Sequence, residues 1–234
     1  MKSWKTKSGY TVTLIMAGRS NVFLLSNGKQ NILIDTSVRR LRAKLLRRLE
    51  QAHIHSIDYI ILTHAHFDHA ANANAIKRKY NSKVIIHREE AGYLSVGNNI
   101  VPEGTFIYSR IMMNLVGKRI FHRFYYEPCI PDLIVHSTFD LKEIGFNAYL
   151  IHNPGHTAGS MSLIVDDEIA IAGDSMFGVF KKSVFPPFAQ DVDQMVRSWK
   201  VLLETGCQAF FPSHGTANSR ILLQKEYDLR VRGI

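Results

Sequence analysis

One short run of residues, Thr63-His64-Ala65-His66-Phe67-Asp68-His69, carries four side chains that could bind a metal ion. It directly follows the apolar segment 57–62, which we expect to form a buried strand. In open α/β folds, ligand sites lie beyond the carboxyl ends of strands, so this run lies where a site is expected. His64 and His66 are two residues apart and should point to the same side of an extended chain.

The chain is then expected to turn, so that Asp68 and His69 face the same cavity from its other flank. Zinc binds imidazole nitrogen and carboxylate oxygen at about 2.0–2.2 Å. Four such ligands within six residues suit two half-sites better than one. Histidines that bind no metal are the alternative, but three imidazoles and a carboxylate crowded into a cavity without a metal would be costly to desolvate.

The run from His64 to His69 resembles the HxHxDH signature of the metallo-β-lactamase superfamily. That family has three further ligands in a fixed order, and this sequence holds a residue for each. They are His156 in Pro154-Gly155-His156-Thr157, Asp174 in Gly173-Asp174, and His214 in Pro212-Ser213-His214-Gly215. Residues 32–36 are also similar to the family's early strand that ends in an aspartate, so the resemblance covers nearly the whole chain.

The resemblance implies a site for two divalent metal ions, above all zinc, with manganese and iron as alternatives. The ligands of the first ion would be His64, His66 and His156. Those of the second would be Asp68, His69 and His214. Asp174 would bridge the two ions. Asp35 is expected nearby, either fixing a ligand histidine or only capping its strand.

Two ions about 3.5–4 Å apart can share a water molecule and lower its pKa towards 7. The implied protein is a dinuclear metal-dependent hydrolase, in which a metal-bridging hydroxide attacks the carbonyl of a small-molecule ester, thioester or lactone. Asp68 is the expected catalytic residue, because beside the hydroxide it could orient it or relay its proton. Enzymes similar to glyoxalase II and to acyl-homoserine lactonases share this core.

A phosphodiesterase or nuclease on the same site is the main alternative. The formal net charge of +9 favours it, since basic proteins attract anionic partners such as nucleic acid. The predicted helix 38–53 carries several arginines, which also fit an ordinary solvated face. We see no additional domain of the kind that the family's RNA-processing members carry, so nucleic acid is the less expected partner. An iron-dependent oxygenase similar to persulfide dioxygenases would need only the first ligand triad.

The alternation of strands and helices predicts an α/β layered fold, and the resemblance implies an αββα sandwich, an α+β four-layer arrangement of two mixed β-sheets flanked by helices. We expect one domain over residues 1–234. The strands predicted from apolar runs are 10–16, 22–25, 31–34, 57–62, 83–86, 147–151, 161–165, 169–172 and 209–211. The predicted helices are 38–53, 70–80, 191–204 and 218–229, with Asp191 and Asn218 as N-caps.

An insertion at about 88–132 is rich in aromatic residues and methionines. It is either a helical cover that packs on the core or on a second subunit of a homodimer, or the apolar wall of a substrate pocket. Its basic residues could attract an anionic group of the substrate. They are Arg88, Arg110, Lys118, Arg119 and Arg123.

The two cysteines, Cys129 and Cys207, form neither a metal-ligand pair nor a disulfide framework, which favours a cytoplasmic setting. No segment approaches the roughly 20 apolar residues that a membrane span needs, so we expect no membrane partner. The expected partner is a small-molecule substrate. Among the remaining histidines, His87 could line the mouth of the cavity and His122 lies in the insertion. Most of them are expected to be structural or exposed.

Overall fold

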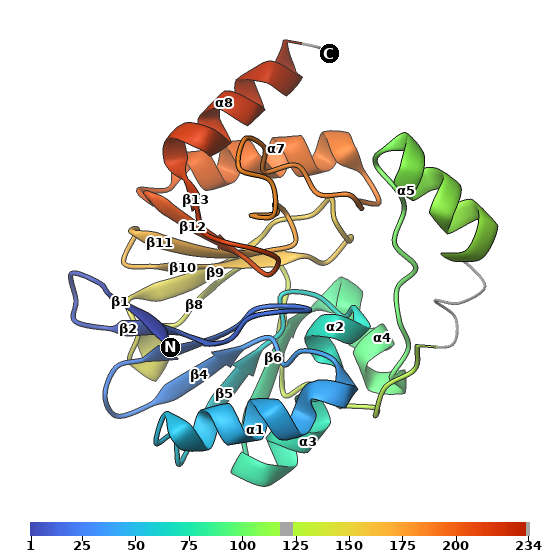
Figure 1. Ribbon diagram of the computed structural model, residues 1–234. Coiled ribbons are helices and arrows are strands. Elements are labelled where there is room, and N and C mark those ends of the chain that lie inside the picture. The colour runs from blue at the N-terminus through green and yellow to red at the C-terminus, as the bar shows by residue number, and fades with distance from the viewer. Residues whose placement is uncertain (118–123, 233–234) are drawn as a thin grey trace.

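Two β-sheets pack face to face, and helices cover both outer faces (Figure 1). The computed structural model describes residues 1–117 and 124–232. The basic residues Lys118, Arg119 and Arg123 of the insertion, together with Phe121 and His122, lie outside the described residues. The four layers confirm the predicted αββα sandwich.

The first sheet has seven strands in chain order and is mixed. Its strands are β1 (Lys2–Lys5), β2 (Thr11–Met16), β3 (Val22–Ser26), β4 (Asn31–Ile34), β5 (Tyr59–Ile61), β6 (Lys83–His87) and β7 (Leu133–Val135). Neighbours are antiparallel from β1 to β4 and parallel from β4 to β7. The carboxyl ends of β4, β5 and β6 therefore meet at one edge, where the loops that follow them can form a site.

The second sheet has six strands in the order β13-β12-β11-β10-β9-β8. These strands are β8 (Thr138–Asp140), β9 (Ala148–His152), β10 (Met161–Val165), β11 (Ile169–Gly173), β12 (Ala209–Pro212) and β13 (Asn218–Ser219). Only the pair β11–β12 is parallel among the described strands of this sheet. The carboxyl ends of β11 and β12 thus also lie side by side.

The helices differ in extent from those predicted. They are α1 (Arg42–Gln51), α2 (Phe67–Ala70), α3 (Ala73–Tyr80), α4 (Arg88–Val96), α5 (Ile107–Met112), α7 (Val192–Glu204) and α8 (Arg220–Val231). The shorter turns are the 3-10 turns η1 (Arg39–Leu41) and η3 (Lys142–Ile144) and the π-turn η2 (Met113–Gly117).

The predicted helix 38–53 was too long, because its first turn is the 3-10 turn η1 and the α-helix begins only at Arg42. The predicted helix 70–80 was also wrong at its start. The helix is interrupted at Asn72, which separates α2 from α3. The side-chain amide of Asn72 donates to the carbonyls of Thr36, Ser37 and Val38. This tertiary anchor overrides the local helical preference.

The two later helices begin as capped helices should. Asp191 caps α7 as predicted, with its carboxylate accepting from the Gln194 N–H at 2.8 Å. The prediction of Asn218 as the other N-cap was wrong. Asn218 lies in β13, where it pairs with Phe210 of β12, and its side chain donates to the Phe177 carbonyl. The N-cap of α8 is Ser219.

Apolar side chains fill three layers. Phe23, Ile34 and Phe211 belong to the layer between the sheets, Leu45 and Leu49 of α1 pack under the first sheet, and Trp199 of α7 packs over the second. Trp199 is fully buried and donates its indole N–H to the Ser175 carbonyl at 2.6 Å, which satisfies its polar atom. The two sheets are therefore held as a rigid base for the loops at their edge.

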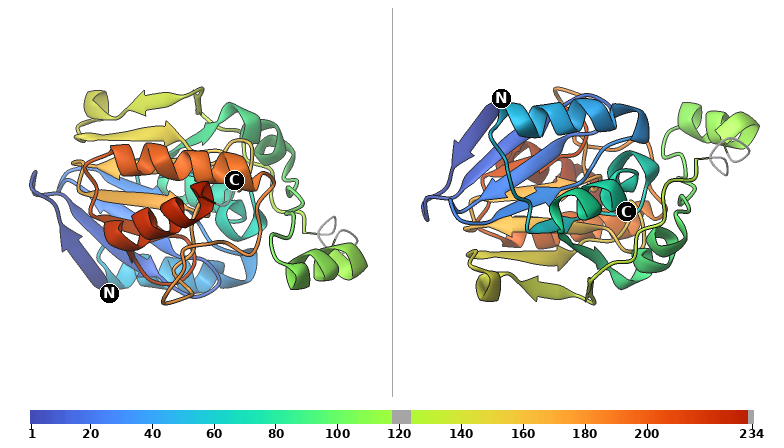
Figure 2. Two further views of the ribbon diagram at one scale, coloured as in Figure 1. Left: turned by 90° about the horizontal axis from the view of Figure 1, so that it is seen from above. Right: turned by 90° about the horizontal axis from the view of Figure 1, so that it is seen from below.

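Within the described part of the insertion, α4 packs on the body and α5 stands away from it in every view (Figures 1 and 2), while residues 98–103 and 124–131 form no regular secondary structure. The exposed apolar residues of α5 and η2 are Ile107, Tyr108, Ile111, Met112 and Leu115. Among the described residues, no helix has the length and apolarity to cross a membrane. Cys129 and Cys207 are both buried and free.

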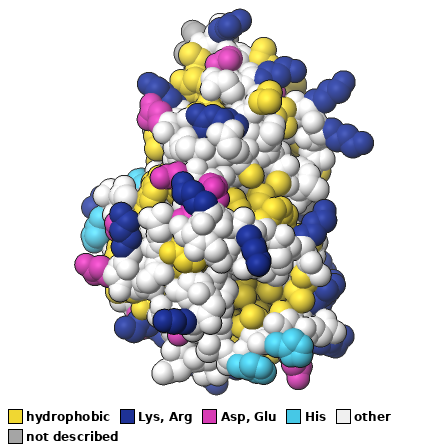
Figure 3. Space-filling view, turned by 90° about the vertical axis from the view of Figure 1, so that its left-hand side faces the viewer, with side chains coloured by type: hydrophobic (Ala, Val, Ile, Leu, Met, Phe, Trp, Pro, Cys, Tyr) yellow, Lys and Arg dark blue, Asp and Glu magenta, His cyan; other side chains and the backbone are white. Residues whose placement is uncertain are grey.

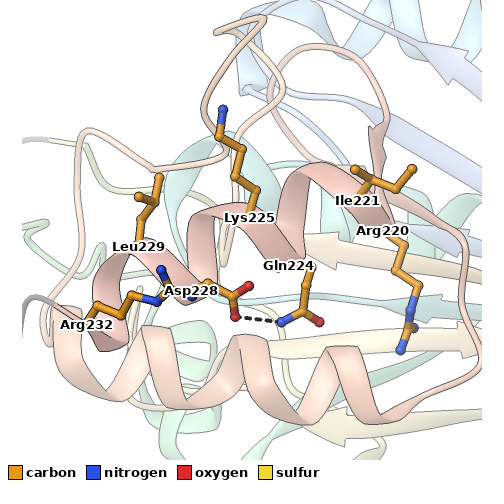
Figure 4. A pocket seen from close by; sticks show the side chains of 7 residues that line it. All are labelled: Arg220, Ile221, Gln224, Lys225, Asp228, Leu229 and Arg232. Carbon is orange, nitrogen blue, oxygen red and sulfur yellow. Dashed lines mark hydrogen bonds between the residues drawn. The ribbon is translucent and has the colours of Figure 1, made fainter.

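The basic charge is not concentrated on the face shown in Figure 3, where Lys and Arg side chains are scattered among hydrophobic and uncharged groups. A separate hollow of about 540 Å³ runs along α8 (Figure 4), and none of the predicted ligands lines it. One of its residues, Arg220, donates to the carbonyls of Leu203, Thr205 and Cys207 and so caps the end of α7. We assign that hollow a structural role.

Candidate metal centre

The seven predicted ligands come from four loops that meet where the two sheets face each other. His64, His66, Asp68 and His69 follow β5, and His156, Asp174 and His214 follow β9, β11 and β12. They form three groups in which the ligand atoms lie within 4.8 Å of one another. The spacing in sequence ranges from adjacent residues, Asp68 and His69, to the 150 positions between His64 and His214, so only the folded chain brings the whole set together.

Two glycines allow the loops to come this close. Gly155, before His156, has a φ of +131°, and a Cβ there would lie 2.4 Å from the backbone of Met195. Gly173, before Asp174, has a φ of +58°, and a Cβ would meet the Thr63 side chain at 2.9 Å. A larger residue would be strained at both positions. This explains why a glycine directly precedes His156 and Asp174.

The first triad brings three ring nitrogens together. His66 Nδ1 lies 2.9 Å from His64 Nε2 and 3.1 Å from His156 Nε2. Neighbours outside the triad occupy the opposite nitrogens: His64 Nδ1 lies 3.0 Å from the Thr63 hydroxyl, and His156 Nδ1 donates to the Phe188 carbonyl at 2.9 Å. Both Nε2 atoms therefore keep their lone pairs for a ligand.

In the second group, too, a neighbour binds one ring nitrogen of a histidine and leaves the other facing the centre. His69 Nδ1 donates to Asp35 at 2.8 Å, which leaves its Nε2 facing Asp68 at 3.8 Å and Asp174 at 3.7 Å. His214 Nε2 lies 3.7 Å from Asp68 Oδ2 and 3.2 Å from Asp174 Oδ2. Asp174 Oδ2 is also 3.5 Å from His156 Nε2. Asp174 thus lies between the two groups, as a bridging carboxylate would.

These residues fit a metal. Three ring nitrogens converge at distances close to the about 3.3 Å that separates ligands around a tetrahedral zinc with bonds of about 2.05 Å. His66 Nδ1 could donate a proton to only one of its two neighbours, so hydrogen bonding alone does not satisfy the triad. His69 Nε2 and Asp174 Oδ1 are buried without any hydrogen-bond partner, and such atoms are costly unless something binds them.

Burial and charge keep His64, His66 and Asp174 in the protonation states that a metal requires. Burial lowers the pKa of His64 and His66 well below the ordinary value for histidine, and the neighbouring imidazoles lower it further. Burial would raise the pKa of Asp174, but His214, His69 and His156 hold it well below the usual range for an aspartate. Neutral imidazoles and an ionised carboxylate are the forms that bind divalent ions.

On the second side, burial opposes charge on His69, but Asp174, Asp35 and Asp68 outweigh it and raise the pKa of His69 well above 6.5. Burial also opposes charge on His214, and Asp174 raises the pKa of that residue too. Without an ion, this side therefore attracts protons. A divalent cation would supply the positive charge instead.

Asp35 accepts a hydrogen bond from His69, one of the predicted ligands, and so does more than cap its strand. Its carboxylate also accepts from the Thr63 N–H and hydroxyl and from the Ser213 hydroxyl. Thr63 and Ser213 each lie one residue before a predicted ligand, so Asp35 ties two ligand loops together while it orients His69. This is a common way of supporting metal-binding histidines.

Sequence reasoning missed two further supports, Glu90 and Tyr126. The Glu90 carboxylate accepts from the Ala65 N–H at 2.8 Å and the Gly159 N–H at 3.0 Å, and the Tyr126 hydroxyl donates to the Ala65 carbonyl at 2.8 Å. Ala65 is the residue between His64 and His66. Glu90 could have been suspected, because it lies just after β6, whose carboxyl end opens at the same edge as β5.

The centre opens into a cavity of about 170 Å³ with a largely aromatic rim. Phe67, Phe177 and Phe188 line it beside Arg19, which was not singled out in the sequence. Arg19 Nε lies 3.6 Å from Asp68 Oδ2, and its guanidinium lies 5.6 Å from the Phe67 ring centre. The cavity is large enough for a small reacting group, and the guanidinium of Arg19 lines one side of it.

Three residues named in the sequence analysis, His87, Arg88 and Arg110, lie outside the lining of the cavity. His87 stacks on His152 at 3.9 Å and donates to the His136 carbonyl, outside the lining of the cavity. Arg88 pairs with Glu89 at 2.9 Å, and Arg110 donates to the Gly104 carbonyl. The expectation that His87 lines the cavity mouth is therefore wrong, and neither Arg88 nor Arg110 lines the cavity.

The chain belongs to the metallo-β-lactamase superfamily, because the model of that family matches residues 15–214. Among curated relatives, the "Probable metallo-hydrolase MJ0888" of Methanocaldococcus jannaschii is 29% identical over 206 residues, which are 86% of this chain and 90% of that protein. A "Hydroxyacylglutathione hydrolase" of Pelagibacter ubique is 24% identical over 70% of this chain and 54% of that protein.

Solved structures agree on the fold. A B3 metallo-β-lactamase called BLEG-1 superposes with a TM-score of 0.69 at 18% identity, covering 94% of this chain and 98% of that one. An archaeal superfamily protein from Sulfolobus tokodaii, ST1585, superposes with a TM-score of 0.63 at 22% identity, covering 91% and 80%. At these identities the likeness concerns the arrangement of the chain.

Proposed function

We propose that the protein is a dinuclear metal-dependent hydrolase of a small-molecule ester, thioester or lactone. The observation that carries the proposal is the position of Asp174, whose Oδ2 faces His156 on one side and His214 on the other. His64, His66 and His156 would hold one ion, and Asp68, His69 and His214 the other. Zinc suits this nitrogen and oxygen donor set, and manganese or iron could also be held by it.

Two divalent ions, when bound, would polarise the substrate carbonyl and lower the pKa of a water molecule. The residues around them have separate tasks. Asp68 is the proposed catalytic residue, which accepts the proton of the attacking water at Oδ2. Arg19, 3.6 Å from that atom, holds the carboxylate in place. Phe67, Phe177 and Phe188 restrict the water that reaches the carbonyl.

The aromatic rim supports a carbonyl substrate over a phosphodiester. Apolar rings accept the acyl or leaving group of an ester or thioester, whereas a nucleic acid would need a track of positive charge. The name of the Pelagibacter ubique relative describes hydrolysis of an acyl thioester, which points in the same direction.

An activity screen of the zinc-loaded protein tests the proposal. We expect hydrolysis of thioesters, esters or lactones to exceed that of bis-(p-nitrophenyl)phosphate by at least about tenfold. Asp174→Asn should lower turnover by more than the about 10–100-fold that loss of an outer partner of a metal site costs. The matched control is Asp140→Asn, an exposed aspartate that pairs with Lys142 and does not line the cavity. Hydrolysis of the phosphodiester alone would favour the nuclease alternative and end the proposal.

A further inference from the structure

The cation beside the metal centre comes from the turn between β2 and β3 and not from the insertion. Arg19 lines the cavity of about 170 Å³ together with the candidate ligands, and no other Lys or Arg of residues 1–117 and 124–232 does so. Arg88 and Arg110 of the insertion lie outside this lining. An anionic group on a substrate at the metals would therefore meet the guanidinium of Arg19.

The turn that carries Arg19 is fixed to the two loops that hold the second group of ligands. The Ser20 hydroxyl donates to the Asp68 carbonyl in the loop after β5. The Asn21 N–H donates to the Ser213 carbonyl in the loop after β12 at 2.6 Å, and its side-chain amide donates to two further carbonyls of that loop, each at 2.9 Å. Ser20 and Asn21 are both buried. The backbone of Arg19 thus keeps a defined place beside the ligands.

The guanidinium of Arg19 has donors left for a ligand. Its Nε lies 3.6 Å from Asp68 Oδ2, and with the described residues this is its only ion pair. Its side chain is 50% exposed, so the two terminal nitrogens can reach a bound molecule. The planar fork of a guanidinium matches the two oxygens of a carboxylate and can bind them together.

The size of the cavity limits where such an anion can lie on the substrate. Arg19 and the ligands share a space of only about 170 Å³, so the anion and the scissile carbonyl must be a few bonds apart. Pro102, Phe177 and Phe188, which also line the cavity, are apolar and offer an anion no partner. A charged group buried without a partner is costly, which leaves Arg19 as its contact.

We propose that Arg19 determines the substrate, by binding a carboxylate a few bonds from the scissile carbonyl, as in a half-thioester of a short dicarboxylic acid. The terminal nitrogens of Arg19 bind the substrate, while its Nε stays next to Asp68. This assignment of the substrate class rests on the proposed function, since it places the scissile carbonyl at the metal centre.

The S-ethyl half-thioesters of malonate and glutarate, each compared with its neutral carboxamide analogue, test the proposal. After subtraction of the uncatalysed rate, the native protein should hydrolyse at least one acid with a kcat/KM about tenfold or more above that of its amide, as a charge-assisted contact predicts. In Arg19→Gln this preference should fall about tenfold, mainly through a higher KM for the acid. If Arg19 serves only to hold Asp68, the variant loses turnover on acid and amide alike, and an unchanged preference overturns the proposal.

Arg47→Gln is the control. It removes the same charge from an exposed position of α1 that does not line the cavity. Both variants are compared at equal zinc content, so that loss of metal is not taken for loss of the contact. An equal fall of the preference in Arg47→Gln would show a long-range effect of net charge and overturn the role of Arg19. A native protein without any preference for the acids would do the same.

A binding measurement separates this proposal from the hydrolase assignment. The N-methylamides of the same half-acids, and of their carboxamide analogues, resist hydrolysis and can be titrated calorimetrically into the zinc-loaded protein. Tighter binding of the acids that is lost in Arg19→Gln and kept in Arg47→Gln supports the contact even if no thioester is cleaved. Equal binding of acids and carboxamides, together with rapid cleavage of all the thioesters, overturns the contact and leaves the hydrolase intact.

Discussion

Glu90 accepts a hydrogen bond from the backbone N–H of Gly159 at 3.0 Å and another from Ala65 at 2.8 Å. It is fully buried, and burial raises the pKa of its carboxyl group. The loops that it joins carry the two parts of the first triad, since Ala65 lies between His64 and His66, and Gly159 follows His156. The geometry of the triad thus depends on a residue that contacts none of its ligand atoms.

Glu90→Ala should weaken both the fold and the metal site. Each buried N–H left without a partner costs about 1–3 kcal/mol, and loss of an outer support typically lowers metal affinity about 10–100-fold. Urea unfolding of the metal-free protein and zinc competition against a chelator measure the two effects. Glu89→Ala, at the exposed neighbouring position, is the control. Unchanged zinc affinity in Glu90→Ala would show that the triad does not need this brace.

Asp35→Asn should lower zinc affinity about 10–100-fold, because an amide that turns its NH2 towards His69 Nδ1 cannot accept that proton. Asparagine is the appropriate replacement because Asp35 has a φ of +61°, a conformation that asparagine tolerates better than alanine. Competition with a chromogenic chelator checks this, with Asp140→Asn as the control. If Asp35 were only a strand cap, the two variants would bind zinc equally well.

The number of metal ions can be tested one side at a time. We expect about two zinc ions per chain in the native protein and about one in each of His156→Ala and His214→Ala, because each variant removes a ligand from a different group. Elemental analysis after dialysis gives the ratio, and the exposed His55→Ala serves as the control. A native chain with one ion, lost in His156→Ala and kept in His214→Ala, would make the centre mononuclear.

His87 should make stability depend on pH. Burial, followed by the neighbouring His152, lowers its pKa from 6.5, and its Nδ1 accepts from the Glu89 N–H. Below a pH of about 6.5 the unfolded chain therefore binds a proton that folded His87 resists, so stability present above this pH is lost as the pH falls. One group contributes at most about 1.4 kcal/mol per pH unit.

Urea unfolding of the metal-free protein between pH 7.5 and 5.5 measures this dependence, which should be weaker in His87→Gln than in the native chain. The contributions of the ligand histidines occur in both proteins and cancel in the comparison. His55→Gln should keep the native dependence. Identical pH profiles for the native chain and His87→Gln would contradict the prediction.

Much of the centre could be predicted from the sequence, because its candidate ligands occur in short local sequence motifs. His64 to His69 follow one strand end directly, and each later ligand stands in a turn motif of its own. The predicted bounds of the strands Asn31–Ile34 and Met161–Val165 are those observed, since short runs made mostly of buried β-branched and aliphatic residues leave few other choices. The assignment of each ligand to an ion, the single domain, the cytoplasmic setting and the homodimer stay predictions.

What only the tertiary structure decided are the contacts between residues far apart in the chain. Asp35 meets Ser213 across 178 positions, and Glu90 meets Gly159 across 69. Asn72 interrupts a helix to bind the loop after β4. No local pattern marks these pairs, because a hydrogen bond between distant residues depends on how the two sheets pack.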